Sequence, residues 1–211
     1  TPNSTHYDTI KKISSSTNYI VCEKPLFINQ YQLDDYKNSN FDNKIFTNFI
    51  YRYDQRIIEF KRNLKKINLY NKLEIIMKQN GKKHDNIINI LVSHCLSIFF
   101  FLFGTLSFHV IKIKSYHKDY VDILFETKTL KLRIACDNNS DDEKFRQIKL
   151  SNDNDLVQMV DFSKNIEGST TPIDNLMTDL INKISSSTDN LNTSIFINSL
   201  LIRLNFLASK I

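Results

Sequence analysis

The most apolar segment of the chain, from Ile87 to Phe108, places the strongest constraint on the fold. Its length and hydrophobicity alone would admit a transmembrane helix. However, His94 and the hydroxyl groups of Ser93 and Ser97 occupy its centre, where a bilayer makes polar groups costly. We therefore predict a helix that is buried between a sheet and a neighbouring domain, with a membrane anchor as the alternative.

The rest of the chain around this segment predicts a mixed α/β protein. A short helix is predicted over residues 28–36, with Asn29 as a possible N-cap. A strand over 44–53, a helix after Asp54 as its N-cap and a strand over 72–78 follow. After the apolar segment, alternating runs at 107–114, 119–127, 130–136, 145–150 and 157–162 predict successive strands. Because the loops between them are short, these strands should form an antiparallel sheet, followed by helices over 173–184 and about 193–208.

Charged residues directly follow a short apolar run near the start of the chain. Residues 19–22 read as the end of a buried strand, and Glu23, Lys24 and Pro25 come next. Ligands of open α/β sheets collect where strands end, at the carboxyl edge. Lys24 is therefore the first candidate for a functional site.

Residues 1–26, which contain the Thr1-Pro2-Asn3 turn with His6 and the Glu23-Lys24-Pro25 motif, resemble part of the Gfo/Idh/MocA family of NAD(P)-dependent oxidoreductases. Thr1, Pro2, Asn3 and His6 match the family's TPNxxH turn, and Glu23, Lys24 and Pro25 match its EKP motif at the same separation. His94 also precedes the Leu102-Phe103-Gly104 sequence by the family's interval. The predicted order of helices and strands is similar to the family's substrate-binding domain throughout.

This resemblance implies an α/β (α+β) fold in two parts. Residues 1–38 would be the C-terminal part of a Rossmann-like nucleotide-binding domain. Residues 39–211 would be a substrate-binding and dimerisation domain with a large, mainly antiparallel open sheet. Copies of the chain could form a homo-oligomer through that sheet face.

The sequence also departs from the family's pattern. No glycine-rich turn occurs, because the only glycines are Gly81, Gly104 and Gly168. We therefore expect that the start of a longer domain is absent or supplied by another chain. The acidic residues that many members place around the histidine are replaced by Ile90 and Ser97.

The resemblance implies hydride transfer between NAD or NADP and a sugar, sugar derivative or polyol. His94 would be the general acid/base and Lys24 the positively charged group that positions the substrate, with a lowered pKa for His94 beside Lys24. The cofactor would contact Thr1, Pro2, Asn3, His6, Glu23, Lys24 and Pro25, and the substrate would contact Lys24, Arg52 and His94. Arg52 could instead form an interdomain ion pair, and the bond between Lys24 and Pro25 could be cis.

Taken singly, these residues have ordinary structural interpretations. Lys24 could be a solvated lysine at a strand end, and His94 a hydrogen-bonded histidine of the core. A non-catalytic binding or regulatory protein that keeps the family fold is therefore the alternative function. The ordered occurrence of all three motifs favours the enzyme.

Composition narrows the choice of partners and location. The net charge of +5 is spread along the chain, which argues against nucleic-acid binding. The three cysteines form no CxxC pair, which is typical of the reducing cytoplasm. Since no secretory signal opens the sequence, we predict a cytoplasmic protein without a membrane partner. His84, His109 and His117 have no partners at ligand spacing, so no metal is predicted.

Overall fold

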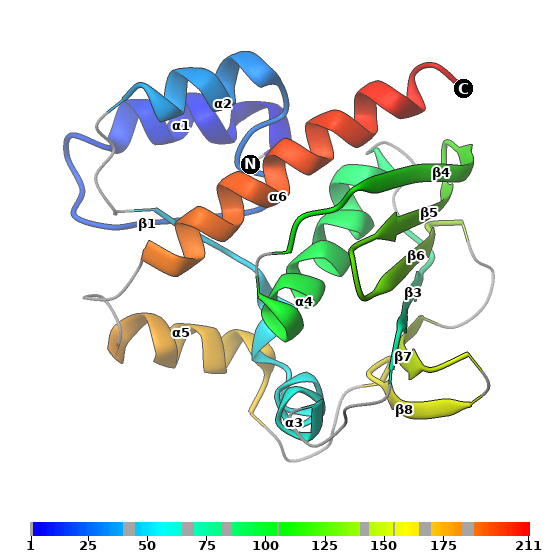
Figure 1. Cartoon of the computed structure of the whole chain (residues 1–211). Helices are drawn as coiled ribbons and strands as arrows, with labels where there is room; N and C mark the ends of the chain where they lie inside the picture. The colour runs from blue at the N-terminus through cyan, green and yellow to red at the C-terminus, as the bar shows by residue number, and fades with distance from the viewer. Residues whose placement is uncertain are drawn as a thin grey trace.

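A computed structural model of the chain describes residues 2–39, 45–64, 70–81, 86–104, 106–139, 144–153, 155–164, 170–182 and 188–211. Helices cover one side of a six-stranded sheet, and a smaller N-terminal layer packs on the far side of the last helix (Figure 1). The first half of the chain forms η1 (Asn3–Thr5), α1 (His6–Ile13), β1 (Ile20–Cys22), α2 (Gln30–Lys37), β2 (Ile45–Thr47), η2 (Ile50–Tyr53), α3 (Gln55–Leu64), β3 (Lys72–Lys78), η3 (Ile88–Val92) and α4 (Ser93–Phe103). The second half forms β4 (Val110–His117), β5 (Tyr120–Glu126), β6 (Lys131–Asp137), β7 (Phe145–Ser151), β8 (Leu156–Asp161), α5 (Pro172–Asn182) and α6 (Thr188–Ala208).

The large sheet confirms the predicted mixed and mainly antiparallel architecture. Its strand order is β4-β5-β6-β3-β7-β8, and only β3 and β6 pair in parallel. Alternate residues of β3 are buried against the helices, which gives the strand its two faces. Leu73 and Ile75 lie opposite Leu150 and Ile148 of β7 on the buried face.

The apolar segment forms the core helix that its sequence predicts. It begins as a turn of π-helix, η3, and continues as α4, whose Cys95, Leu96 and Phe99 are fully buried. The Sγ atoms of Cys95 and Cys136 lie 3.7 Å apart as free thiols. The helix ends at Gly104, whose φ of 73° lies in a region that L side chains rarely adopt.

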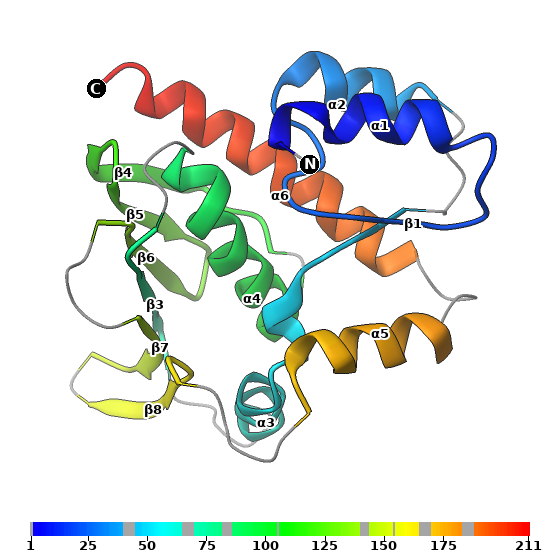
Figure 2. The ribbon, with the colours of Figure 1, turned by 180° about the vertical axis from the view of Figure 1, so that it is seen from behind.

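Helix α6 joins the two parts of the molecule. It runs between the N-terminal layer and α4 in both views (Figures 1 and 2). By length and composition its residues Leu191–Ala208 could cross a membrane, a test that core helices of soluble proteins also pass. Its polar Ser194 and Asn198 are buried and hydrogen-bonded to Thr47 and to the Phe27 amide, so they tie α6 to the N-terminal layer.

The N-terminal layer contains a two-stranded parallel sheet. Strand β1 pairs with β2, and α2 begins after Asn29, whose side chain caps it as predicted by accepting a hydrogen bond from the Gln32 amide. The strand predicted over residues 44–53 is shorter, because the chain turns after Thr47 and forms η2. Since β2 and Leu191 of α6 pack into this layer, contacts cross residue 38, where a domain boundary was predicted. That boundary stays a prediction.

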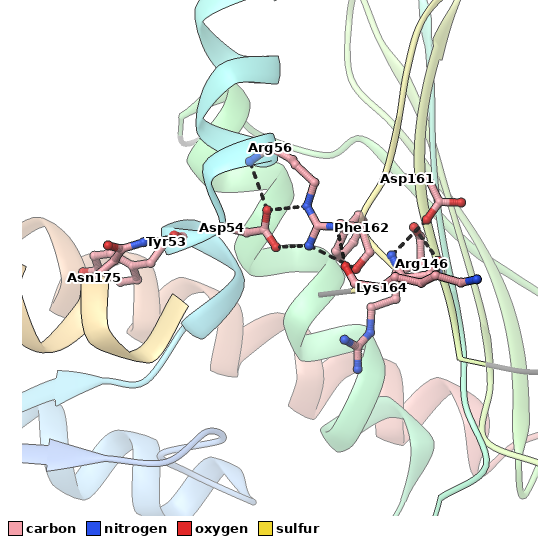
Figure 3. Close-up of polar contacts among 9 residues, drawn as sticks. Tyr53, Asp54, Arg56, Arg146, Asp161, Phe162, Lys164 and Asn175 are labelled. Carbon is pink, nitrogen blue, oxygen red and sulfur yellow. Dashed lines mark hydrogen bonds and ion pairs between the residues drawn. The ribbon is translucent and has the colours of Figure 1, made fainter. Parts of the chain in front are cut away.

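An ion pair fixes the start of α3 against the end of β8. The carboxylate of Asp54 accepts hydrogen bonds from the Arg56 amide and from two guanidinium nitrogens, which confirms Asp54 as the cap (Figure 3). Arg56 also donates to the carbonyl oxygens of Phe162 and Lys164. The pair thus connects η2 and α3 to the chain that follows β8.

Candidate active site

The two N-terminal sequence motifs meet in space through His6. This histidine is buried at the start of α1, and its Nδ1 lies 2.9 Å from the carbonyl oxygen of Pro25. The bond between Lys24 and Pro25 is cis. On the opposite side of the loop, the Phe27 amide donates to Asn198 of α6. Contacts from α1 and α6 therefore fix the loop that carries Lys24.

The remaining described residues predicted to bind the cofactor lie in this loop or in the turn before α1. Pro2 and Asn3 form the turn that leads into α1, and Glu23 is exposed directly after β1. The Glu23 carboxylate accepts a hydrogen bond from the Asn48 side chain, which follows β2. Both charged residues of the EKP motif thus follow the carboxyl end of a parallel strand. Thr1 lies outside the described residues.

Lys24 contacts the helix that carries His94. Its ammonium group donates to the carbonyl oxygens of Ile90 at 2.6 Å and Asn89 at 3.4 Å, both in the π-helical turn η3. His94 comes four residues after Ile90, in the first turn of α4. The structure therefore brings together the two residues that were predicted to be catalytic, although they lie 70 positions apart in the sequence. Turns of π-helix occur often at functional sites.

His94 is only partly buried, but its environment disfavours the imidazolium form. Its Nδ1 is buried and has no hydrogen-bond partner among the described residues. The ring packs edge-on against Tyr51 of η2, with 4.6 Å between the ring centroids. Burial, followed by the positive charges of Lys24 and Arg146, lowers the pKa of His94 well below its ordinary value. The imidazole is therefore neutral at pH 7, as expected for a proton acceptor.

Arg146 and Tyr51 join the site without having been predicted from the sequence. The Arg146 guanidinium carbon lies 4.8 Å from the centre of the Tyr51 ring, which in turn contacts His94. The alternation of β7 could have identified Arg146, because residues two apart in a strand lie on the same face. Arg146 comes two residues before the buried Ile148 and four before the buried Leu150. Its side chain therefore lies on the face of the sheet that α4 covers.

Arg52 occupies a different environment from the one expected. Its Nε donates to the carbonyl oxygen of Ser97, and its guanidinium lies over the Phe49 ring at 4.5 Å. Burial lowers the pKa of Arg52 to about 10. It forms no ion pair with any residue in the described part of the chain, and the expected interdomain ion pair stays a prediction. The guanidinium thus contacts one carbonyl oxygen of α4 and one aromatic ring, and its Nη2 is buried without a hydrogen-bond partner among the described residues. Its contact with substrate stays a prediction.

The described residues also bear on metal binding. Within the ranges that the structure covers, no group of three or more His, Cys, Asp or Glu side chains could hold a metal ion. His84 lies outside those ranges, while His109 lies 4.0 Å from the carboxylate of Glu126. The candidate active site described above consists of Lys24, His94, Tyr51 and Arg146. Lys24 and Arg146 carry its positive charges.

The lowered pKa of His94 gives a direct test of this geometry. In an NMR titration, we expect the His94 imidazole to stay neutral down to a pH below 6.5, the usual histidine value. Arg146→Gln should raise this pKa because one of the two nearby cations is lost, whereas Arg203→Gln, on the exposed side of α6, should not change it. Because the unfolded chain takes up this proton more readily than the folded one, His94 should also reduce stability as the pH falls below 6.5. A wild-type pKa at or above 6.5 would contradict the arrangement.

No protein-family model matches the sequence, and no curated protein matches it. Among solved structures, a myo-inositol dehydrogenase from Corynebacterium glutamicum superposes with a TM-score of 0.76 at 13% identity, covering 99% of this chain and 75% of that one. The dehydrogenase MviM from Clostridium difficile gives a TM-score of 0.77 at 14% identity, covering 97% and 76%.

A third similar structure was solved with ligands. It is the WlbA (WbpB) dehydrogenase from Thermus thermophilus in complex with NAD and UDP-GlcNAcA, with a TM-score of 0.74 at 13% identity and coverage of 97% of this chain and 69% of that one. Identities this low establish the fold alone. Together with the motifs that meet around Lys24, these superpositions show that the chain has the fold of the Gfo/Idh/MocA-type dehydrogenases.

Proposed function

We propose that the protein is an NAD(P)-dependent oxidoreductase that acts on a CH-OH group of a sugar, sugar derivative or polyol. The observation that carries this proposal is the contact between Lys24 and the helical turn that leads into His94. The similar structures support it, because they include a myo-inositol dehydrogenase and a dehydrogenase bound to NAD.

The described residues fit one end of a dinucleotide. Glu23 and Lys24 follow the carboxyl end of β1, and His6 holds this loop beside the turn formed by Pro2 and Asn3. These residues, with Pro25, would hold the nicotinamide end. A glycine-rich turn for the pyrophosphate does not occur among the 211 residues. When bound, the cofactor supplies or accepts the hydride.

The chain's own residues would handle the proton and the charge. His94, neutral at pH 7, accepts the proton of the substrate hydroxyl during oxidation and returns it during reduction. The Lys24 ammonium, held by two carbonyl oxygens, stabilises negative charge on the same substrate oxygen. Lys24 therefore has two roles, since its charge adds to the effect of burial in lowering the pKa of His94.

The test combines cofactor binding with turnover. NADH and NADPH fluorescence titrations of the purified protein should show saturable binding, and a panel of hexoses, hexuronates and inositols should include a substrate that reduces NAD or NADP. Absence of both binding and turnover contradicts the proposal. Binding without turnover on any panel member favours the alternative, a non-catalytic binding or regulatory protein with the same fold.

Location and assembly complete the proposal. A cytoplasmic location and a homo-oligomer formed through the sheet both stay predictions. The helices leave one face of the sheet uncovered (Figure 1). On that face Arg133 of β6 binds Asp122 and Glu74 in an ion-pair network. An uncovered sheet face of this kind offers a surface for a second copy of the chain.

A further inference from the structure

Arg146 is a buried cation that has no acidic partner among the described residues. The residue is 9% exposed, and its guanidinium forms no hydrogen bond or ion pair with any described residue. Two other arginines are paired, since Arg56 binds Asp54 and Arg133 binds Asp122 and Glu74. Burying a charge is costly unless a partner compensates it.

Asp54 is the carboxylate that acts electrostatically on Arg146, but it is already paired with another arginine. Both of its carboxylate oxygens accept hydrogen bonds from Arg56. In Figure 3 the Arg56 guanidinium is enclosed by Asp54 and by the end of β8, whereas the Arg146 guanidinium extends toward α4. Arg146 is therefore directed toward the helix that carries His94.

The position of Arg146 relative to His94 suits a ligand that touches both. Arg146 lies on the buried face of the sheet, opposite Met77, where the neighbouring residues are apolar. Two ring contacts connect it to the candidate active site, one from Arg146 to Tyr51 and one from Tyr51 to His94. A sugar whose hydroxyl group reaches His94 could therefore extend a substituent along Tyr51 to Arg146.

We propose that Arg146 binds an oxyanion on the substrate, so that the protein selects acidic sugars, with a carboxylate or phosphate, over neutral ones. A planar guanidinium binds either group through two parallel hydrogen bonds, which adds both affinity and orientation. The bound anion would neutralise the buried charge and fix the sugar beside His94. This inference rests on the proposed function, because it takes the sugar acid bound at Arg146 to be the substrate of the oxidoreductase.

Binding can be measured without cofactor or turnover, which separates this proposal from the proposed function. Isothermal titration of the protein with D-glucuronate, D-glucose 6-phosphate and D-glucose compares a carboxylate, a phosphate and a neutral sugar. At least one acid should bind about tenfold or more tightly than glucose, as expected for a charge-assisted pair of hydrogen bonds. The tighter of the two acids identifies the substituent.

Variants at position 146 decide whether this residue is responsible. Arg146→Gln should remove the preference for the acid, and Arg146→Lys should retain part of it because the charge remains. Arg203→Gln is the matched control on the exposed face of α6 and should keep the full preference. Circular dichroism verifies that each variant is folded, and the wild-type comparison of the three sugars stands even if Arg146→Gln does not fold.

The outcomes separate the two proposals. Equal affinity for acidic and neutral sugars, binding of neither acid, or an unchanged preference in folded Arg146→Gln would each overturn the role of Arg146. Acid-selective binding that depends on Arg146, in a protein that neither binds NAD(P)H nor turns over, would support this site while contradicting the proposed function.

Discussion

His94→Asn should lower turnover by about 10²- to 10⁴-fold, the usual contribution of a general acid or base. Asparagine keeps a polar side chain at the position but cannot exchange a proton near neutral pH. The measurement is the steady-state rate of NAD(P)H formation with the substrate found in the sugar panel. His109→Asn is the matched control, because His109 is exposed on the loop before β4 and should leave the rate unchanged.

Lys24→Met should lower turnover by about 10²- to 10³-fold, because the positive charge beside the reacting oxygen is lost while the side chain stays long. The same variant should raise the pKa of His94, since Lys24 is one of the charges that lower it. Lys112→Met, on exposed strand β4, is the control. Unchanged turnover in both the His94 and Lys24 variants would discard the mechanism.

Arg56→Met should reduce the free energy of unfolding by about 3 kcal/mol, the lower end of the range for a broken buried ion pair. The Asp54 carboxylate, which is 5% exposed, would lose its cationic partner. The carbonyl oxygens of Phe162 and Lys164 would lose their donor as well. Urea denaturation followed by circular dichroism measures the change.

A double variant distinguishes the ion pair from general packing. Asp54→Asn combined with Arg56→Met removes the uncompensated charge and should recover part of the lost stability, whereas two unrelated losses would add. The interpretation fails if Arg56→Met costs less than about 1 kcal/mol, the value typical of an exposed ion pair.

Local sequence patterns predicted most of the individual elements. Strand β3 covers Lys72–Lys78 as predicted, because alternation between two faces is encoded in neighbouring residues. The Asn29 cap of α2 could also be predicted, because a cap depends on contacts within four residues. The three sequence motifs that contain His6, Lys24 and His94 predicted the dehydrogenase fold that the superpositions confirm.

Elements that depend on distant contacts were predicted less well. The run over residues 44–53 has the composition of a strand, but it pairs with β1 only over Ile45–Thr47. Beyond Thr47 the chain turns into η2, which packs against α4 and leads to the Asp54 cap of α3. Strand propensity does not indicate where the neighbouring strand ends, so the strand over residues 44–53 was predicted too long.

The sequence alone determined most of the helices and strands, the Gfo/Idh/MocA-type fold and the choice of Lys24 and His94 as candidates, because these follow from periodicity and from motifs. Only the tertiary structure revealed that Tyr51 and Arg146 lie beside His94. That proximity depends on the packing of η2, α4 and β7, which are far apart in the chain. A buried charge without a partner can be recognised only when the side chains that surround it in space are known.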